Sequence, residues 1–454
     1  MRVKMPLLRL LHLCGTARGA PWLVEMLREL QARGHDVTAV ISPGEGGLAD
    51  ALDAAGVRHL ALDHDVLLGA RPLGATRRIS ALVQLLRRER PDVLQSHLFP
   101  SNVAGRFAGW LADVPIRLSM NAGPYFLESP IFDRVEVLTS RLDTRVIASC
   151  EYTRRLYIEK GVPADRVALI YYGSRADRFD PTKADAQRLR RDLGLPADVP
   201  LIGMVAYFYP PPMRGPEVSP RLAGRGIKGH DILLHALPRL LARLPRAHVA
   251  FVGDGWGPLG VAYQREMKAL AASLGVSHAV TFMGHRTDVT DILAGVDVAV
   301  QCSRSENLGG AIEALLMGAP LVVTRVGGLV DAVHDGETGL VVPPDDPSAL
   351  ADAIIRLASD RPFARRLGAA GRALMLDRFT MARTADDVDA LCRTLAQDAG
   401  LASTGRLRGY RLIRTIARAC RVPILAARVG IALAPMLTVR WRQRLVSKLR
   451  GAAR

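Results

Sequence analysis

The stretch that decides the fold is SRSENLGGAIEALLMGAP, residues Ser303–Pro320. An apolar run, Val296–Gln301, precedes it and is typical of a buried strand, whereas Cys302–Gly310 is polar and ends in two glycines. Ala311–Met317 is apolar except for one carboxylate, and Gly318 follows it, which predicts a short helix with a glycine stop. A buried strand, a glycine-containing loop and a helix form the repeating unit of an α/β protein with a parallel sheet.

The same unit recurs along the chain and predicts two doubly wound, Rossmann-like domains that face each other across a cleft. Asp180–Pro200 is polar, contains three prolines and separates the two series. We place the first domain at 1–185, the second at 186–375, and a closing helix that packs back toward the first domain at 376–400. The other predicted strands are short apolar runs: Leu7–Cys14, Val37–Ser42, Pro91–Ser96, Arg145–Ser149, Val167–Tyr171, Leu201–Ala206, Ala247–Gly253, Ala279–Met283, Leu321–Thr324 and Gly339–Val342.

The composition is that of a globular protein with a sizeable core, because 49% of the 454 residues are apolar and 23% are charged. The five cysteines are scattered and form no CxxC pair, which disfavours a zinc or redox motif and fits a reducing cytosol. Leu11–Cys14 lacks the small residues and the long preceding apolar run of a secretory signal. We therefore expect a cytoplasmic protein.

The net charge of +17 is concentrated in residues 401–454, which hold 13 lysines and arginines and no acidic residue. Within this tail, Val422–Val439 is apolar except for Arg428, but that arginine and two prolines make a membrane span costly. We expect a basic, helical and amphipathic extension that lies on an anionic membrane surface, at the inner face of the cytoplasmic membrane. Packing against the protein or a partner is the alternative, and no motif favours nucleic acid.

A series of motifs runs through roughly residues 7–385 in a fixed order. They are Arg33–Thr38, Arg90–His97, Tyr171–Pro181, Lys228–Asp231, Val252–Gly255, Ser305–Ala314, Gly318–Val322 and Val326–Gly328. In number, order and spacing they resemble the family-4 glycosyltransferases of the GT-B fold, in particular bacterial transferases that build surface polysaccharides or lipid-linked glycans.

The stretch quoted first resembles the segment with which this family holds its donor, a sugar nucleotide. The amides of Gly309, Gly310 and Ala311 lie at a predicted helix start, where unpaired N–H groups suit a pyrophosphate. The resemblance assigns Glu313 to the ribose hydroxyls and Glu306 to the transferred sugar. These glutamates are seven positions apart, whereas the family usually has eight. The alternative for each is a solvated glutamate or one that compensates a helix dipole.

The family supplies two cations for the leaving diphosphate, an arginine and, a few residues on, a lysine. Lys228 matches the lysine, but Tyr207 stands where the arginine is expected. A proline-rich insertion, Phe208–Ile227, follows and contains three arginines. We predict that Arg225, three residues before Lys228, replaces the missing cation. The alternative is a solvated loop arginine.

Three further loops are assigned to the nucleotide. Gly284, His285 and Arg286 resemble the loop whose backbone contacts the base. Asp254 and Gly15 stand in glycine-containing loops that follow predicted strands, where the backbone can approach a ligand closely.

The first domain offers candidates near the reacting sugar and the acceptor. Asn121 stands where the family has a histidine, and an amide can hydrogen-bond a sugar hydroxyl but cannot act as a base. His97, at a predicted strand end, is a second candidate, with a structural histidine as the alternative. Trp22 and Glu25, in the helix after the first loop, are candidates for acceptor contacts.

The resemblance implies a retaining, metal-independent hexosyltransferase that needs no cofactor. It would move a sugar from a nucleoside diphosphate sugar, UDP being favoured, to a hydroxyl of a glycan or lipid-linked acceptor. Two other readings stay open. One is a nucleotide-sugar epimerase with the same fold, and the other is a non-catalytic subunit that binds a sugar nucleotide.

Overall fold

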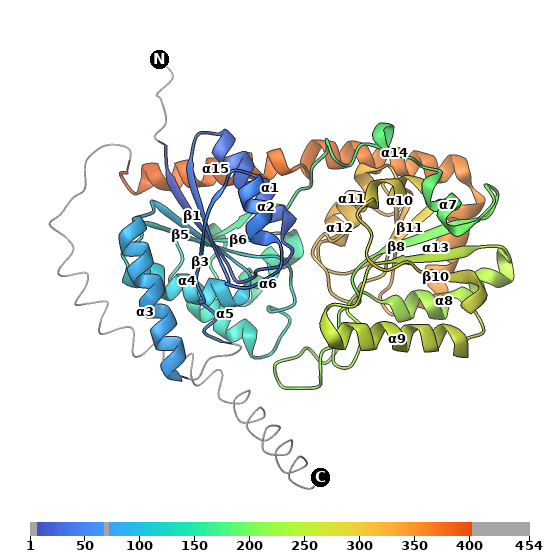
Figure 1. The fold of residues 1–454 in the computed structure, drawn as a ribbon, viewed down its shortest axis with the longest axis horizontal. Helices are drawn as coiled ribbons and strands as arrows, with labels where there is room; N and C mark the ends of the chain where they lie inside the picture. Colours follow the sequence, from blue (N-terminus) through green and yellow to red (C-terminus); the bar gives the residue numbers. More distant parts are fainter. Residues whose placement is uncertain (1–6, 68–71, 402–454) are drawn as a thin grey trace, which may run out of the picture.

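The computed structural model describes residues 7–67 and 72–401, and these residues form two sheets whose strands are all parallel (Figure 1). The first sheet has the order β3-β2-β1-β4-β5-β6-β7 and the second the order β10-β9-β8-β11-β12-β13. The predicted basic extension lies outside the described residues, apart from residue 401. The α/β class and the two doubly wound domains are confirmed.

Apart from β3 and β5, which the apolar runs did not predict, the strands coincide with the predicted runs to within a few residues. In the first sheet the strands are β1 (Arg9–Cys14), β2 (Asp36–Ile41), β3 (Arg58–Ala61), β4 (Val93–His97), β5 (Ile116–Asn121), β6 (Arg145–Ala148) and β7 (Val167–Leu169). In the second they are β8 (Leu201–Val205), β9 (His248–Val252), β10 (Val280–Phe282), β11 (Val298–Gln301), β12 (Leu321–Thr324) and β13 (Leu340–Val342).

Helices cover both faces of each sheet. Those of the first half are α1 (Pro21–Ala32), α2 (Leu48–Ala54), α3 (Pro72–Glu89), α4 (Phe99–Leu111), α5 (Phe132–Ser140) and α6 (Glu151–Glu159). The others are α7 (Arg188–Leu193), α8 (His230–Arg243), α9 (Gly257–Ser273), α10 (Val289–Gly295), α11 (Ala311–Leu316), α12 (Leu329–Ala332), α13 (Pro347–Ser359), α14 (Arg361–Arg378) and α15 (Met381–Asp398).

The strand order reverses direction once in each sheet, between β1 and β4 in the first and between β8 and β11 in the second. At such a switch point the neighbouring loops leave toward opposite faces, which opens a crevice at the carboxyl ends of the strands. In the second sheet the Gln301 side chain spans this point, since its Nε2 donates to the carbonyl oxygen of Val205 at 3.1 Å. The loop Cys302–Gly310 therefore begins at the position where a ligand site is expected.

The last helix, α15, belongs to the core of the first domain although it follows the second domain in the chain. Its buried residues Val388, Cys392 and Leu395 join the cluster that contains Met26 and Leu30 of α1. Figure 1 shows α14 and α15 passing in turn along both domains.

A buried polar network ties α4, α5 and β5 together inside the first domain. The guanidinium of Arg106 donates to Glu136 and Asp143, each at 2.6 Å, and all three side chains are at most 1% exposed. The Tyr157 hydroxyl donates to the same Glu136 carboxylate at 2.6 Å, and Asn121 Nδ2 donates to the Tyr157 oxygen at 2.6 Å. The network therefore ends at Asn121, on the last residue of β5.

Candidate active site

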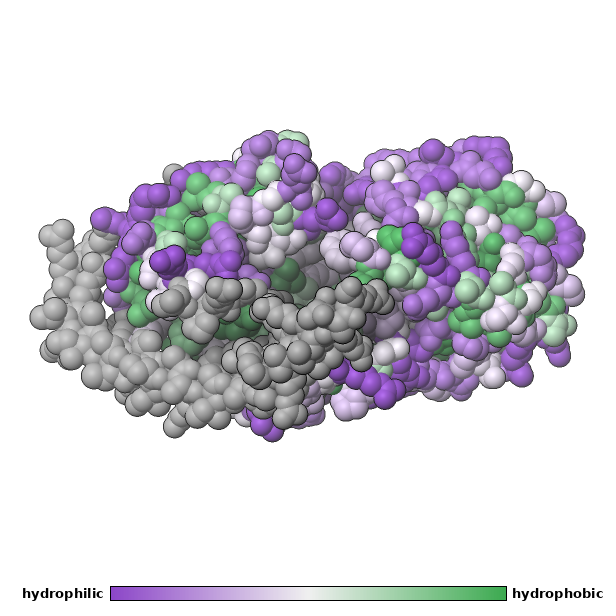
Figure 2. Space-filling view, turned by 60° about the horizontal axis from the view of Figure 1, so that its bottom comes forward, coloured by the Kyte–Doolittle hydropathy of each residue, from purple (hydrophilic) through white to green (hydrophobic). Residues whose placement is uncertain are grey.

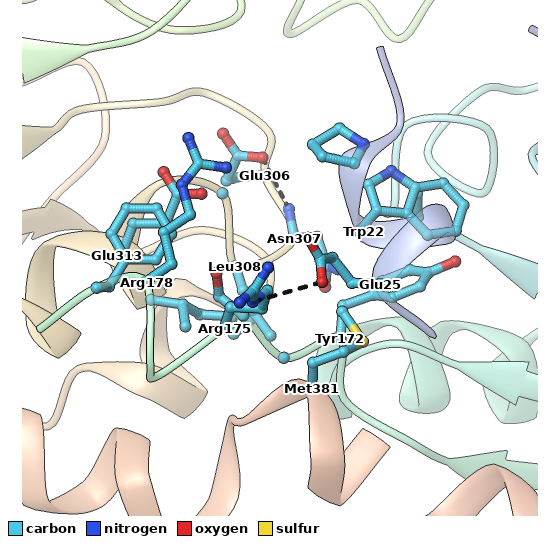
Figure 3. Close-up of a pocket in the computed structure, with 17 residues that line it drawn as sticks. Trp22, Glu25, Tyr172, Arg175, Arg178, Glu306, Asn307, Leu308, Glu313 and Met381 are labelled. Atoms are coloured by element: carbon cyan, nitrogen blue, oxygen red, sulfur yellow. Dashed lines mark hydrogen bonds and ion pairs between the residues drawn. The ribbon is translucent and has the colours of Figure 1, made fainter. Parts of the chain in front are cut away.

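A cavity of about 310 Å³ lies between the two domains (Figure 3). The first domain contributes α1 and the end of β5, and the segment Tyr172–Phe179 that leaves the first domain forms one wall. The second domain contributes the loop Glu306–Gly309 and the first turn of α11. The lining residues are Pro21, Trp22, Glu25, Ala122, Tyr172, Gly173, Ser174, Arg175, Arg178, Phe179, Glu306, Asn307, Leu308, Gly309, Ile312, Glu313 and Met381.

Glu306 is held in the cavity wall by its own loop and by one lysine. Its Oε2 pairs with Lys228 Nζ and accepts a hydrogen bond from Ser303 Oγ at 3.1 Å, and the backbone N–H of Asn307 donates to its Oε1 at 3.2 Å. Gly309 has φ +50°, and a Cβ at this residue would lie 2.8 Å from the Glu306 carboxyl carbon. A glycine is therefore required for the loop to fold around this carboxylate.

Lys228 lies behind Glu306, between the insertion and the start of α8. Its side chain is 19% exposed, and Nζ lies 5.7 Å from the centre of the Tyr209 ring. Burial disfavours the ammonium, but the neighbouring Glu306 carboxylate outweighs this effect and raises the pKa of Lys228 above its ordinary value. The two side chains thus form a preorganised charge pair at the switch point.

Glu313 lies on the first turn of α11 and faces the same cavity. Burial raises the pKa of its carboxyl above the ordinary value, and the charge of nearby Arg178 opposes that rise. Within the described residues Glu313 forms no ion pair, and a partly desolvated carboxylate of this kind is suited to accept hydrogen bonds from neutral hydroxyl groups. This is the chemistry that a ribose offers.

Glu313→Gln is expected to stabilise the free protein at neutral pH. A raised folded-state pKa means that ionising the carboxyl costs stability as the pH rises through that pKa, and glutamine removes this cost. The melting temperature of the variant should exceed that of the wild type at pH 8. The difference should vanish as the pH falls below the ordinary glutamate value of 4.5. Differential scanning fluorimetry across this pH range measures it, with Glu337→Gln as an exposed control. A wild type more stable than the variant at pH 8 would contradict the expectation.

His97 and Asn121, which were predicted to lie beside the reacting sugar, do not line the cavity in the structure. His97 is 0% exposed; its Nε2 lies 3.1 Å from His12 Nδ1, and its ring packs against Trp22. Asn121 is 1% exposed and ends the network that begins at Arg106. Because neither side chain presents an atom to the cavity, both serve the packing of the first domain.

Arg225 is also placed elsewhere than predicted. Its guanidinium pairs with Asp345 Oδ2 at 3.0 Å, and the same carboxylate binds Arg304 at 2.6 Å. The insertion that carries Arg225 has no helix or strand in the structure. Arg225 is therefore bound to a carboxylate of the second domain and is not among the residues that line the cavity.

The loops assigned to the nucleotide lie at the carboxyl edges of the sheets but outside the cavity lining. Gly284 accepts a hydrogen bond at its carbonyl from the Gly253 N–H at 2.8 Å, which joins the β9 and β10 loops beside Asp254. The His285 ring lies parallel to that of Tyr207, and Arg286 pairs with Asp192 and Asp288. Their contacts with a base stay predictions.

The first-domain loop at Gly15 is closely packed. A Cβ at this residue would lie 2.7 Å from Ser101 Oγ, so a larger side chain would displace α4. Gly310 and Ala311 stand at the start of α11, which is six residues long.

Trp22 and Glu25 line the cavity from α1, as their candidacy for acceptor contacts requires. Two arginines that the sequence did not single out, Arg175 and Arg178, line it from the segment after β7. Arg175 is bound by carboxylates, because its Nε lies 3.0 Å from Asp177 Oδ1 and 3.6 Å from Glu25 Oε2. A spacing pattern could not reveal either arginine, since the segment has no regular structure.

Within residues 7–67 and 72–401, no three histidine, cysteine or acidic side chains are grouped so that they could hold a metal ion. The same residues include no helix with the length and apolarity needed to cross a membrane. On the face drawn in Figure 2, hydrophilic residues predominate and hydrophobic ones occur in small separate groups.

Two family models match the chain, one to each domain. A glycosyl transferase 4-like domain matches residues 19–173, and the model described as glycosyl transferases group 1 matches residues 220–360.

Curated relatives extend the similarity over most of the chain. A lipopolysaccharide core biosynthesis glycosyltransferase, LpsE of Rhizobium meliloti, is 30% identical over 79% of this chain and 91% of its own length. A D-inositol 3-phosphate glycosyltransferase of Corynebacterium diphtheriae is 28% identical over 77% and 83%. The D-inositol 3-phosphate glycosyltransferase of Corynebacterium urealyticum matches over about half of each protein, 51% of this chain and 51% of its own length.

The crystal structure of HepE from Anabaena in complex with UDP has a similar fold. It superposes with a TM-score of 0.71 over 85% of this chain and 100% of HepE, at 20% identity. Two facing parallel-sheet domains, both family models and the near full-length match to LpsE define the protein as a glycosyltransferase with the GT-B fold. The chain belongs to the family-4 glycosyltransferases.

Proposed function

We propose that the protein is a retaining, metal-independent glycosyltransferase. In this proposal it moves a sugar from a nucleoside diphosphate sugar, UDP being favoured, to a hydroxyl of a glycan or lipid-linked acceptor. The product would belong to a surface polysaccharide or a glycolipid. The observation that carries the proposal is that Glu306 and Glu313, from one loop and helix, line a single cavity between the domains.

The similar proteins support the choice of donor and acceptor. The Anabaena structures are complexes with UDP, with UDP and glucose, and with UDP-glucose. The name of LpsE places that relative in lipopolysaccharide core synthesis. A lipid-linked or glycan acceptor follows for this chain by analogy.

The proposed reaction is a displacement on the same face of the donor sugar. The bond between the sugar C1 and the phosphate oxygen breaks, and the acceptor oxygen forms a bond with C1. The proton of the acceptor hydroxyl passes to the departing phosphate. Glu306 orients the sugar, Glu313 holds the ribose, and Lys228 stabilises the negative charge that develops on the diphosphate. Catalysis then rests on positioning and on fixed positive charge.

The reaction is tested by incubating the protein with radiolabelled UDP-sugars and a membrane extract. Free UDP together with a new glycoside supports transfer, and NMR of the glycoside should show the anomeric configuration of the donor. Activity should persist in EDTA. An isomeric sugar nucleotide would indicate an epimerase, and UDP binding without turnover would indicate a non-catalytic subunit. Glu306→Gln serves as the matched inactive variant.

We also propose that the protein acts at the inner face of the cytoplasmic membrane, through the basic segment 401–454. Deleting this segment is expected to move the protein from the membrane to the soluble fraction, because about 1 kcal/mol of attraction is lost with each cation near an anionic surface. Sedimentation with phosphatidylglycerol vesicles measures the effect, and neutral phosphatidylcholine vesicles are the control. Unchanged recovery on anionic vesicles would refute the role of the segment.

A further inference from the structure

The donor proposed above carries a diphosphate, which needs a cation, and the cavity is rich in carboxylates. Glu25, Glu306 and Glu313 all line it. A dianion or trianion enters such a site only where positive charge is available to it. A cation that already binds a carboxylate is less available to the diphosphate than a cation that binds none.

Most of the cations around the site are engaged. Lys228, which the proposed reaction already assigns to the diphosphate, pairs with Glu306, and Arg225 pairs with Asp345. The other engaged guanidinium groups, each bound to at least one carboxylate, belong to Arg175, Arg286 and Arg304.

Arg178 differs from these cations. Within the described part of the chain it forms no ion pair, and its side chain lines the cavity on the same wall as Glu313 (Figure 3). It is exposed, and its charge reaches the Glu313 carboxyl electrostatically. An arginine can bind two phosphate oxygens at once through its planar fork of N–H donors.

The backbone of Arg178 is anchored to the donor domain although the residue comes from the segment between the domains. The next residue, Phe179, is 3% exposed in the core of the second domain, and Arg372 Nη1 donates to its carbonyl oxygen at 3.2 Å. The N–H groups of Arg178 and Phe179 both donate to the Arg175 carbonyl, at 3.2 and 3.0 Å. Arg178 is therefore held beside Glu313 by contacts with the second domain.

We propose that Arg178 binds the diphosphate of the donor and stabilises the leaving nucleoside diphosphate. This inference rests on the proposed nucleotide-sugar donor. The positive charge thus comes from the segment that joins the domains.

The test compares UDP, UMP and uridine binding by isothermal titration calorimetry. A diphosphate contact predicts that Arg178→Ala weakens UDP binding roughly tenfold or more and leaves uridine binding unchanged. Arg178→Lys should recover part of the loss, because it restores the charge without the planar fork. Arg239 lies on α8, is exposed and pairs with Asp352 of α13. The variant Arg239→Ala should therefore bind all three ligands like the wild type.

Three outcomes would overturn the inference. In the first, UDP and uridine affinities fall together, which indicates a structural role. In the second, neither changes. In the third, Arg225→Ala weakens the binding of UDP and not that of uridine, while Arg178→Ala has no such effect. A wild type that binds none of the three ligands would instead defeat the proposed UDP-sugar donor, and that result does not depend on any variant.

Discussion

Lys228→Ala is expected to lower kcat roughly 100- to 1,000-fold or more, the effect of removing one donor aimed at developing negative charge in an enclosed site. The loss has two sources. The ammonium no longer faces the leaving diphosphate, and Glu306 keeps a carboxylate that has lost its cation in a wall where it is 10% exposed.

Steady-state kinetics at saturating donor measures this effect, and circular dichroism checks the fold. Lys228→Arg should retain more activity than alanine, because it keeps the charge pair with Glu306. Lys268 is an exposed lysine of α9 that lies over the ring of Phe282 in β10. The variant Lys268→Ala is the matched control and should leave kcat unchanged. Activity of Lys228→Ala within tenfold of the wild type would remove Lys228 from the mechanism.

The largest loss of stability is expected from Arg106→Met. Removing one partner of a buried ion pair costs about 3–5 kcal/mol, and here the guanidinium serves both Glu136 and Asp143. The effect should concentrate in the first domain, because the network joins α4, α5 and β5. Hydrogen exchange of the β5 and β6 amides measures the local free energy of opening.

A second variant separates two contributions to the loss of stability, the unpaired buried charges and the altered packing. Arg106→Met combined with Glu136→Gln and Asp143→Asn removes the stranded carboxylates and should recover part of the lost stability. Arg88→Met is the exposed control, because the Arg88 side chain on α3 is 68% exposed. Amide protection equal to that of the wild type in Arg106→Met would show that the network contributes little.

The fold could be predicted from the sequence largely because parallel strands buried on both faces read as continuous apolar runs. Two strands were missed for physical reasons. β3, Arg58–Ala61, is short and half polar. β5 carries Ser119 and Asn121 on buried positions, so its pattern resembles a loop. Those polar residues are tolerated because the Arg106 network satisfies them, and this is a property of the tertiary structure.

The site could be predicted where a local pattern fixes the chemistry. Glu306, Glu313 and Lys228 come from motifs at or just before helix starts. Glu306 and Glu313 line the cavity, and Lys228 pairs with Glu306. His97 is the last residue of a strand, but whether a side chain at such a position faces a ligand or the core depends on neighbours distant in sequence. Arg178 could not be found, because its position is set by the anchoring of Phe179 in the second domain.

The packing of α15 on α1 has a consequence for synthesis on the ribosome. The apolar stripe of α1 emerges first, but Val388, Cys392 and Leu395, which cover it, emerge only after the whole second domain. During translation the nascent first domain therefore exposes part of its core to water. A chain truncated before Met381 would keep that surface uncovered, so it should engage chaperones and aggregate even though its second domain is intact.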